Sequence, residues 1–185
     1  MELRQLAVGC VETSSIARGI ESADAMCKAA EVRLLACNPV CPGKYFIIVG
    51  GLVAEVESAV RAGEAVAADT LTDSMLIPRV HAQVLDAFTA MVPFDQVEAI
   101  GMIETFSLPS AIVAGDAAAK SAQVTLLEIR LARALGGKAF VLFTGKVAAV
   151  SAALEAGKQA GAANGLMLGT TLIPSPHPDL VKHLL

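Results

Sequence analysis

The side chains best suited to chemistry lie together in residues 37–46, around the run Cys-Pro-Gly-Lys that begins at Cys41. A cysteine thiolate can act as a nucleophile or as a metal ligand, so this segment is the first candidate for a site. Pro39 and Pro42 lack backbone donors, and Gly43 permits a tight bend. We therefore expect the aliphatic strands on either side to stop here and to leave Cys41 at the tip of a loop.

The other three cysteines are poorer candidates for chemistry. All four lie in the first half of the chain, and in a reducing cytosol we expect buried thiols or metal ligands rather than disulfides. Cys10 and Cys27 are predicted to be packing residues, on a strand and on an apolar helix face. Cys37 ends a strand about 13 Å of extended chain from Cys41, so both could bind one centre only if the loop folds back. Lys44 stands where a C-x3-C-x2-C cluster motif needs its third cysteine, which excludes that motif.

Composition restricts the class of protein. The chain of 185 residues is 55% hydrophobic but only 4% aromatic, which predicts a core of small aliphatic side chains. Its longest apolar run, residues 45–54, is interrupted by two glycines and is shorter than the ~18 residues of a membrane span. No signal peptide is expected, and we predict a soluble cytoplasmic protein without a membrane partner. The net charge of −4 argues against nucleic acid, and the low charged fraction of 17% suggests that subunits cover part of the surface.

The chain repeats itself. The strand-like pattern Val8–Thr13 recurs at Ile100–Thr105, 92 positions later, and matches continue through the segments that follow. The offset grows to 94 from residue 43 onward, and to 96 at the motif Leu-Ile-Pro-x-x-His, which ends at His81 and again at His177. Growing offsets indicate small insertions in loops of the second copy. The pattern is that of a tandem duplication.

Periodicity within each copy predicts the order β-α-β-β-α-β. In the first copy we expect strands at 6–13, 32–37, 45–49 and 70–77, with helices at 15–30 and 53–67. The first helix should bury a stripe of apolar residues, namely Ile16, Ile20, Ala23, Cys27 and Ala30. A short helix at 81–91 then leads to the second copy. The fold class is therefore α+β, two ferredoxin-like domains at 1–92 and 93–185, each an antiparallel sheet with both helices on one face.

Several segments carry a family resemblance, and most of them occur in both copies. The second copy shows them as Ile100–Thr105, Asp116–Lys120, Gly136–Lys138, Thr144–Val147 and Leu172–His177. These segments resemble the bacterial microcompartment shell domain, and the likeness covers nearly the whole chain. The resemblance implies a tandem-domain, non-enzymatic shell protein whose homotrimers form pseudo-hexameric tiles beside other shell proteins, in a microcompartment shell in the cytoplasm.

The Cys-Pro-Gly-Lys run is similar, more narrowly, to the iron–sulfur-carrying members of this family in propanediol-utilising compartments. The resemblance implies that the loop between the second and third strands lines the pore, so that three copies of Cys41 meet near a threefold axis. A cubane cluster needs four iron ligands, usually thiolates, and three chains supply three of them. We expect one cluster, of the [4Fe-4S] type, per trimer. It would pass electrons across the shell to or from a lumenal or cytosolic redox enzyme. The expected pore-lining residues are Pro42, Gly43, Lys44, Gly136, Gly137 and Lys138.

The duplication also creates three pairs of equivalent charged or titratable residues, for which the sequence gives less specific predictions of function. Lys28 and Lys120 occupy equivalent helix ends, and the resemblance implies that both lie at the tile edge and contact neighbouring tiles. His81 and His177 have no second ligand at metal-binding spacing, so a structural or interface role is predicted. Glu12 and its equivalent Glu104 are paired by duplication, which is no evidence of an acid–base dyad.

Three alternative functions stay open at this stage. The same tile could have an open pore for small metabolites, with loop amides and lysines favouring anions. Duplicated ferredoxin-like domains also build oligomeric regulatory proteins that bind small molecules. An oxidoreductase that uses Cys37 and Cys41 as a dithiol pair is the third alternative.

Overall fold

The computed structural model describes residues 7–89, 92, 97–130 and 136–184. Two compact units are present, and each is described by itself. The elements of the first repeat are β1 (Ala7–Thr13), α1 (Ile16–Ala29), β2 (Arg33–Val40), β3 (Lys44–Gly51), α2 (Val53–Ala67), the 3-10 turn η2 (Ala68–Thr70), β4 (Leu71–Ile77) and α3 (Ala82–Thr89). Those of the second are β5 (Ala99–Thr105), α4 (Leu108–Ser121), β6 (Val124–Arg130), β7 (Ala139–Gly145), α5 (Val147–Gly161), β8 (Met167–Ile173) and α6 (Pro178–Leu184).

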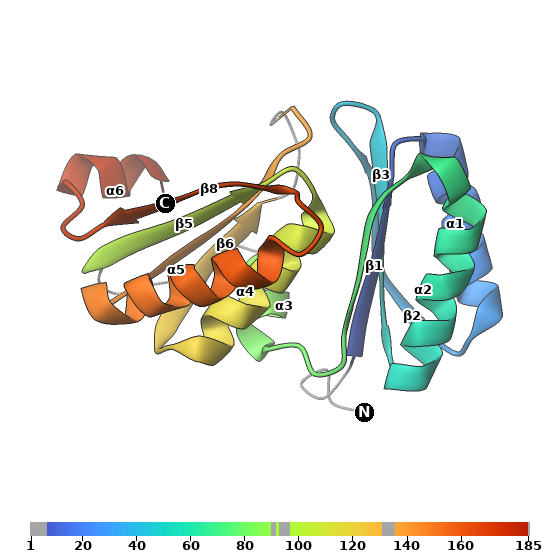
Figure 1. Ribbon diagram of the computed structural model, residues 1–185, viewed down its shortest axis with the longest axis horizontal. Coiled ribbons are helices and arrows are strands. Elements are labelled where there is room, and N and C mark those ends of the chain that lie inside the picture. Colours follow the sequence, from blue (N-terminus) through green and yellow to red (C-terminus); the bar gives the residue numbers. More distant parts are fainter. Residues whose placement is uncertain (1–6, 90–91, 93–96, 131–135, 185) are drawn as a thin grey trace. The chain divides into compact units, whose positions relative to one another are not determined.

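Each repeat folds its four strands into one antiparallel sheet. The strand order is β2-β3-β1-β4 in the first repeat and β6-β7-β5-β8 in the second, so the order β-α-β-β-α-β and the duplication are confirmed. In the first repeat, α1 and α2 pack against each other on one face of the sheet (Figure 1). The order β-α-β-β-α-β predicted this arrangement, with both helices on one face of an antiparallel sheet.

The cores consist of small aliphatic side chains that bring helix and sheet close together. In the first repeat, buried Val11, Ile47 and Val49 pack with Met26 of α1 and Val56 of α2. In the second repeat, the buried side chains of Ile100, Leu127 and Leu142 form a cluster against which Val181 and Leu184 of α6 pack. Helix α6 was not predicted from the sequence. Among the described residues, no helix is long and apolar enough to cross a bilayer.

The structure corrects three predictions about the first repeat. Strand β2 does not stop at Cys37 but continues through Pro39, which lies opposite Tyr45 of β3. Because β2 is an edge strand, a proline there need not interrupt the ladder. Helix α1 buries Gly19, Ser22, Ala23 and Met26, so Ala23 of the predicted stripe is buried, whereas Ile16 and Ile20 are exposed. Cys27 is exposed as well, so its predicted packing role is also wrong.

The compact units do not coincide with the repeats. The first unit consists of residues up to Val80 together with Ser107–Pro109 and residues 136–138 of the second repeat. The second unit takes in α3, the last element of the first repeat. Each repeat therefore contributes a short segment to the compact unit built around the other. The predicted domain boundary after residue 92 stays a prediction, and Pro93, predicted to form a turn there, lies outside the described residues.

Close packing of α2 on β1 requires the absence of a side chain at Gly9. A Cβ atom built there would lie 2.7 Å from Val56 Cγ1 and closer still to Val60. We expect Gly9→Ala to lower the free energy of unfolding by about 1–3 kcal/mol, because α2 would have to move away from the sheet. Gly169→Ala is the matched control, since a Cβ atom at that position in β8 has no neighbour within 4 Å. Urea unfolding followed by circular dichroism measures both, and equal losses would contradict the packing argument.

Candidate functional site at the turn between β2 and β3

Cys41 lies at the tip of the hairpin formed by β2 and β3. Strand β2 ends at Val40 and β3 begins at Lys44, so only three residues form the turn. The backbone N–H of Gly43 donates to the Val40 carbonyl at 3.0 Å, and Gly43 has a φ of +89°, which glycine adopts without strain. The Cys41 thiol is exposed. The predicted position of Cys41 at a tip is thus confirmed, on a turn shorter than expected.

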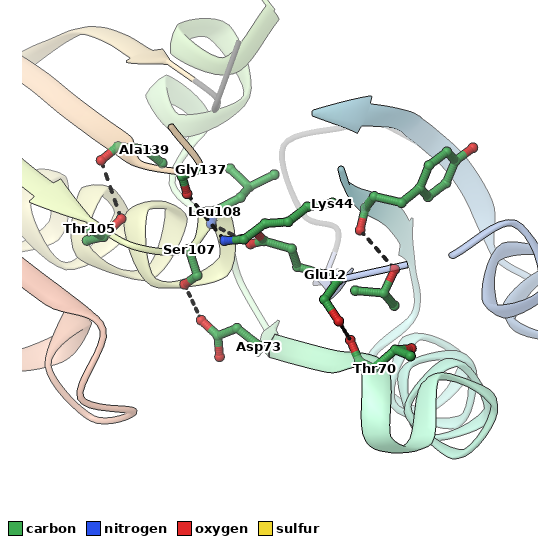
Figure 2. A network of polar contacts seen from close by, with 12 residues as sticks. Glu12, Lys44, Thr70, Asp73, Thr105, Ser107, Leu108, Gly137 and Ala139 are labelled. Atoms are coloured by element: carbon green, nitrogen blue, oxygen red, sulfur yellow. Dashed lines mark hydrogen bonds and ion pairs between the residues drawn. The ribbon is translucent and has the colours of Figure 1, made fainter. Parts of the chain in front are cut away.

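The lysine after this turn points back into the protein. Lys44 Nζ lies 2.8 Å from Glu12 Oε1 and donates to the Gly137 carbonyl at 3.3 Å (Figure 2). The Glu12 side chain is 1% exposed and that of Lys44 is 16% exposed, so both charges are largely removed from water. A pair of this kind costs desolvation energy that its hydrogen bonds must offset. Lys44 is therefore a positioning residue of the hairpin, and its predicted pore-lining role stays a prediction.

Glu12 has a second partner at the start of α4. The backbone N–H of Leu108 donates to Glu12 Oε2 at 2.7 Å, where an anion also meets the positive end of the helix dipole. Burial raises the pKa of the Glu12 carboxyl above its ordinary value, and the hydrogen bond and charge of Lys44 oppose this rise. The ionised carboxylate thus depends on Lys44 for much of its stabilisation.

A second carboxylate lies at the same helix start. The Ser107 hydroxyl donates to Asp73 Oδ2 (Figure 2). Asp73 Oδ1 accepts from the Ser74 backbone N–H at 2.9 Å. Asp73 and Ser107 are both buried. Two acidic residues of the first repeat, on β1 and β4, therefore hold residues 107 and 108 in the first compact unit.

Gly137 of the second repeat lies against the Cys41 turn. Gly136 and Gly137 have φ values of +61° and +85°, and a Cβ atom at Gly137 would lie 2.9 Å from Pro42 Cδ. Both conformation and space therefore favour glycine at position 137. The structure brings together Pro42, Gly43, Lys44 and Gly137 of the predicted pore-lining set. Lys138 precedes β7 and is half-buried.

Cys37 is separated from Cys41 by an extended strand. It pairs with Ile47 of β3 and packs on the core of the first repeat. Burial, with the Cys37 thiol contributing, raises the pKa of the Tyr45 hydroxyl. Four residues of strand span about 13 Å, whereas a disulfide requires Cα atoms within about 7 Å. This geometry opposes the alternative of a Cys37–Cys41 dithiol pair. Cys10 is fully buried, as predicted, and burial raises the pKa of its thiol.

The two lysines assigned to a tile edge both form ion pairs one helical turn back. Lys28 Nζ lies 2.6 Å from Asp24 Oδ2 on the exposed side of α1. Lys120 pairs with Asp116 in α4, and the Asp116 carboxylate also accepts from the His81 backbone N–H at 2.7 Å. His81 thus contacts the second repeat through its backbone. The edge role of Lys28 and Lys120 stays a prediction.

Sequence reasoning missed Glu12 as a functional position. A glutamate inside the apolar strand Ala7–Thr13 was a signal, because a buried carboxylate requires a partner. Its partner Lys44 is distant in sequence, and only the antiparallel pairing of β1 with β3 brings them together.

The fold and the site define a class of protein: a tandem pair of α+β domains with a glycine-rich turn region. The BMC domain family matches the chain twice, over residues 7–80 and 99–176, and the chain belongs to this family. It is a structural shell protein of a bacterial microcompartment. The expected fold class and the expected location in a microcompartment shell are thereby confirmed.

Three relatives illustrate the membership. The chain is 36% identical over 178 residues to the shell protein PduT of Citrobacter freundii, covering 96% of this chain and 97% of the relative. The shell protein PduA of the same organism is 42% identical over 89 residues, which are 48% of this chain and 94% of PduA. A microcompartment protein from Desulfitobacterium hafniense DCB has a crystal structure with a TM-score of 0.84 and 49% identity, covering 96% of this chain and 99% of that one.

Removing the cation from the buried pair should destabilise the protein. We expect Lys44→Met to lower the free energy of unfolding by about 2–4 kcal/mol near neutral pH, because it leaves the Glu12 carboxylate buried without its counter-charge. Without Lys44 the folded-state pKa of Glu12 rises further, and a raised carboxyl pKa lowers stability as pH increases through it. The loss should therefore shrink when urea unfolding is repeated at pH 5 instead of pH 7.5.

The double variant Glu12→Gln/Lys44→Met serves as the control for charge. Replacing both charged groups removes the uncompensated carboxylate, so this variant should recover part of the stability lost in Lys44→Met. A loss in Lys44→Met that is independent of pH and is not reduced in the double variant would contradict the role assigned to the pair.

Proposed function

We propose that the chain forms a homotrimeric, pseudo-hexameric shell tile in which the Cys41 side chains of three copies converge at a central pore and hold one iron–sulfur cluster. The observation that carries this proposal is the exposed Cys41 thiol at the tip of a short hairpin. The similarity to PduT and the double match to the BMC domain support a tile built from two domains per chain.

The residues present fit a cluster only if several chains contribute. Within the described part of one chain, no group of three or more histidine, cysteine or acidic side chains could hold a metal ion. Iron–sulfur clusters are usually held by cysteine thiolates, and Cys41 offers one accessible thiol per chain. Three copies related by a threefold axis supply three ligands, which leaves the fourth iron to a non-protein ligand.

The surroundings of Cys41 would keep these ligands in place. Lys44 ties the base of the hairpin to Glu12 and Gly137, and Pro42 packs against Gly137. A ligand on a short turn fixed at both sides loses little conformational entropy when it binds a shared centre. The buried ion pair therefore preorganises the thiol.

The bound cluster would supply one-electron redox chemistry between the two sides of the shell. The chain's own residues would position the thiols, and the small turn residues would allow the three tips to approach one another. Redox enzymes inside or outside the compartment are the expected partners, and no catalytic role is assigned to the chain itself.

An open-pore tile is the second candidate. A Cβ atom at Gly43 or Gly136 would meet nothing within 4 Å, so both turns border open space. Such space would suit passage of a small metabolite. The Lys44 charge is matched by Glu12, which weakens the expectation that this lysine would attract anions.

Anaerobic purification followed by iron and sulfide analysis and electron paramagnetic resonance tests the cluster. We expect about four iron atoms for every three wild-type chains, because one cubane cluster would be shared by a trimer. Cys41→Ser should lose both iron and signal, whereas Cys37→Ser and Cys27→Ser should retain them. Sedimentation of each variant shows whether the trimer itself persists.

The outcomes separate the levels of the proposal. Iron that persists in Cys41→Ser would overturn the ligand assignment. A wild-type trimer that contains no iron or sulfide would contradict the cluster and favour the open-pore tile. A protein that sediments only as a monomer would overturn the tile.

A further inference from the structure

The Lys44 side chain passes close to the backbone of Cys41. A Cβ atom built at Gly137 would lie 3.6 Å from Lys44 Cε and 3.5 Å from the Cys41 carbonyl oxygen, so both atoms surround the same point. The Lys44 ammonium donates to the Gly137 carbonyl at 3.3 Å. Within the first compact unit, a positive charge therefore lies beside the turn that carries the candidate ligand.

The counter-charge of Lys44 lies farther from the tip of the hairpin. Glu12 on β1 pairs with Phe46, which is two residues beyond Lys44 along β3. The other carboxylate oxygen of Glu12 accepts from the Leu108 backbone N–H at the start of α4. The ion pair is thus a dipole, with its cation on the side of the Cys41 turn and its anion on the side of the helix start.

Water screens these two charges poorly, because the side chains of Lys44 and Glu12 are largely buried. The charge of a second buried carboxylate, Asp73 on β4, also acts on Glu12. Lys138, at the start of β7, is half-buried. Replacing one member of the pair while Asp73 and Lys138 stay in place therefore changes the electric field at the Cys41 turn.

We propose that the Lys44–Glu12 pair sets the reduction potential of the iron–sulfur cluster that three Cys41 thiolates would hold. Reduction adds one negative charge, so Lys44 favours the reduced cluster and Glu12 favours the oxidised one. The inference rests on the proposed function and adds to it, since it gives the buried pair an electrostatic effect besides its effect on the position of the thiol.

The redox step is the transfer of one electron without a proton. A reductant such as dithionite supplies the electron to the iron–sulfur core, and no bond to Cys41 breaks. Glu12 and Lys44 keep their protonation states and act through their charges alone. Neither side chain is a ligand of iron in this proposal, so both act at a distance on the centre that Cys41 binds.

Two consequences distinguish a field effect from a loosened turn. Three chains would share one cluster, so a single substitution changes three charges around it. Removing a cation and removing an anion should then shift the potential in opposite directions. A loosened turn would expose the cluster to solvent in either variant, and greater exposure would shift both potentials the same way.

A redox titration of the anaerobically purified trimer, poised with dithionite and redox dyes and followed by electron paramagnetic resonance, measures these shifts. We expect Glu12→Gln to change the reduction equilibrium at least tenfold in favour of the reduced cluster, which is 59 mV or more for one electron. Lys44→Met should lower the potential. Both are measured at pH 8.5, because burial raises the pKa of the Glu12 carboxyl and the loss of Lys44 raises it further.

Two variants restore the charge balance and serve as controls. Lys44→Arg keeps the cation, so its potential should remain that of the wild type. The double variant Glu12→Gln/Lys44→Met removes both charges, and its potential should lie between those of the single variants. Arg61→Met removes an exposed cation that pairs with Glu57 on α2, and it should leave the potential unchanged because water screens that charge.

The outcomes separate this inference from the proposed function. Equal potentials in wild type and Glu12→Gln, or shifts of the same sign in Glu12→Gln and Lys44→Met, would overturn the tuning role and leave the cluster in place. A wild type that binds iron while every variant of the pair loses it would assign the pair to ligand placement alone, which also overturns tuning. A wild-type trimer that gives no iron signal would overturn both proposals.

Discussion

A buried carboxylate must find partners, and in this protein the requirement of Glu12 organises the region around Cys41. Its two oxygens accept from the Lys44 ammonium and from the first backbone N–H of α4. Lys44 in turn reaches the carbonyl of Gly137. One residue on β1 thus links a hairpin, a helix start and a turn that are far apart in sequence. Removing one of these partners would leave a buried polar group without a hydrogen bond that it makes here.

The same requirement explains why a polar network occurs in a chain so rich in alanine, valine and glycine. Small aliphatic side chains allow close packing of helices on sheets but give few directional contacts. The hydrogen bonds that Ser107 donates to Asp73 and Leu108 donates to Glu12 are directional, because a hydrogen bond weakens when donor and acceptor are misaligned. Apolar packing stabilises each sheet, and the polar contacts determine which segments of the second repeat join the first unit.

Duplication gave the two repeats equivalent residues in different environments. Leu108 and Ile16 occupy the same position in the repeat, yet one is buried and the other is exposed. Such pairs act as an internal comparison, because sequence and local structure are matched and only the surroundings differ. The exposed member identifies the surface that the isolated chain leaves uncovered. For a shell protein, that comparison relates the fold of one chain to the assembly of many.

The sequence by itself determined the duplication, the α+β order of each repeat and the position of Cys41 in a turn, because periodicity, glycine and proline act locally. Helix α2 was predicted at its observed bounds for the same reason. The tertiary structure decided which face of α1 is buried, whether β2 tolerates Pro39, and that Lys44 pairs with Glu12. Each of these depends on which elements become neighbours. An apolar stripe shows that a helix can be covered, but only packing decides whether its own chain covers it.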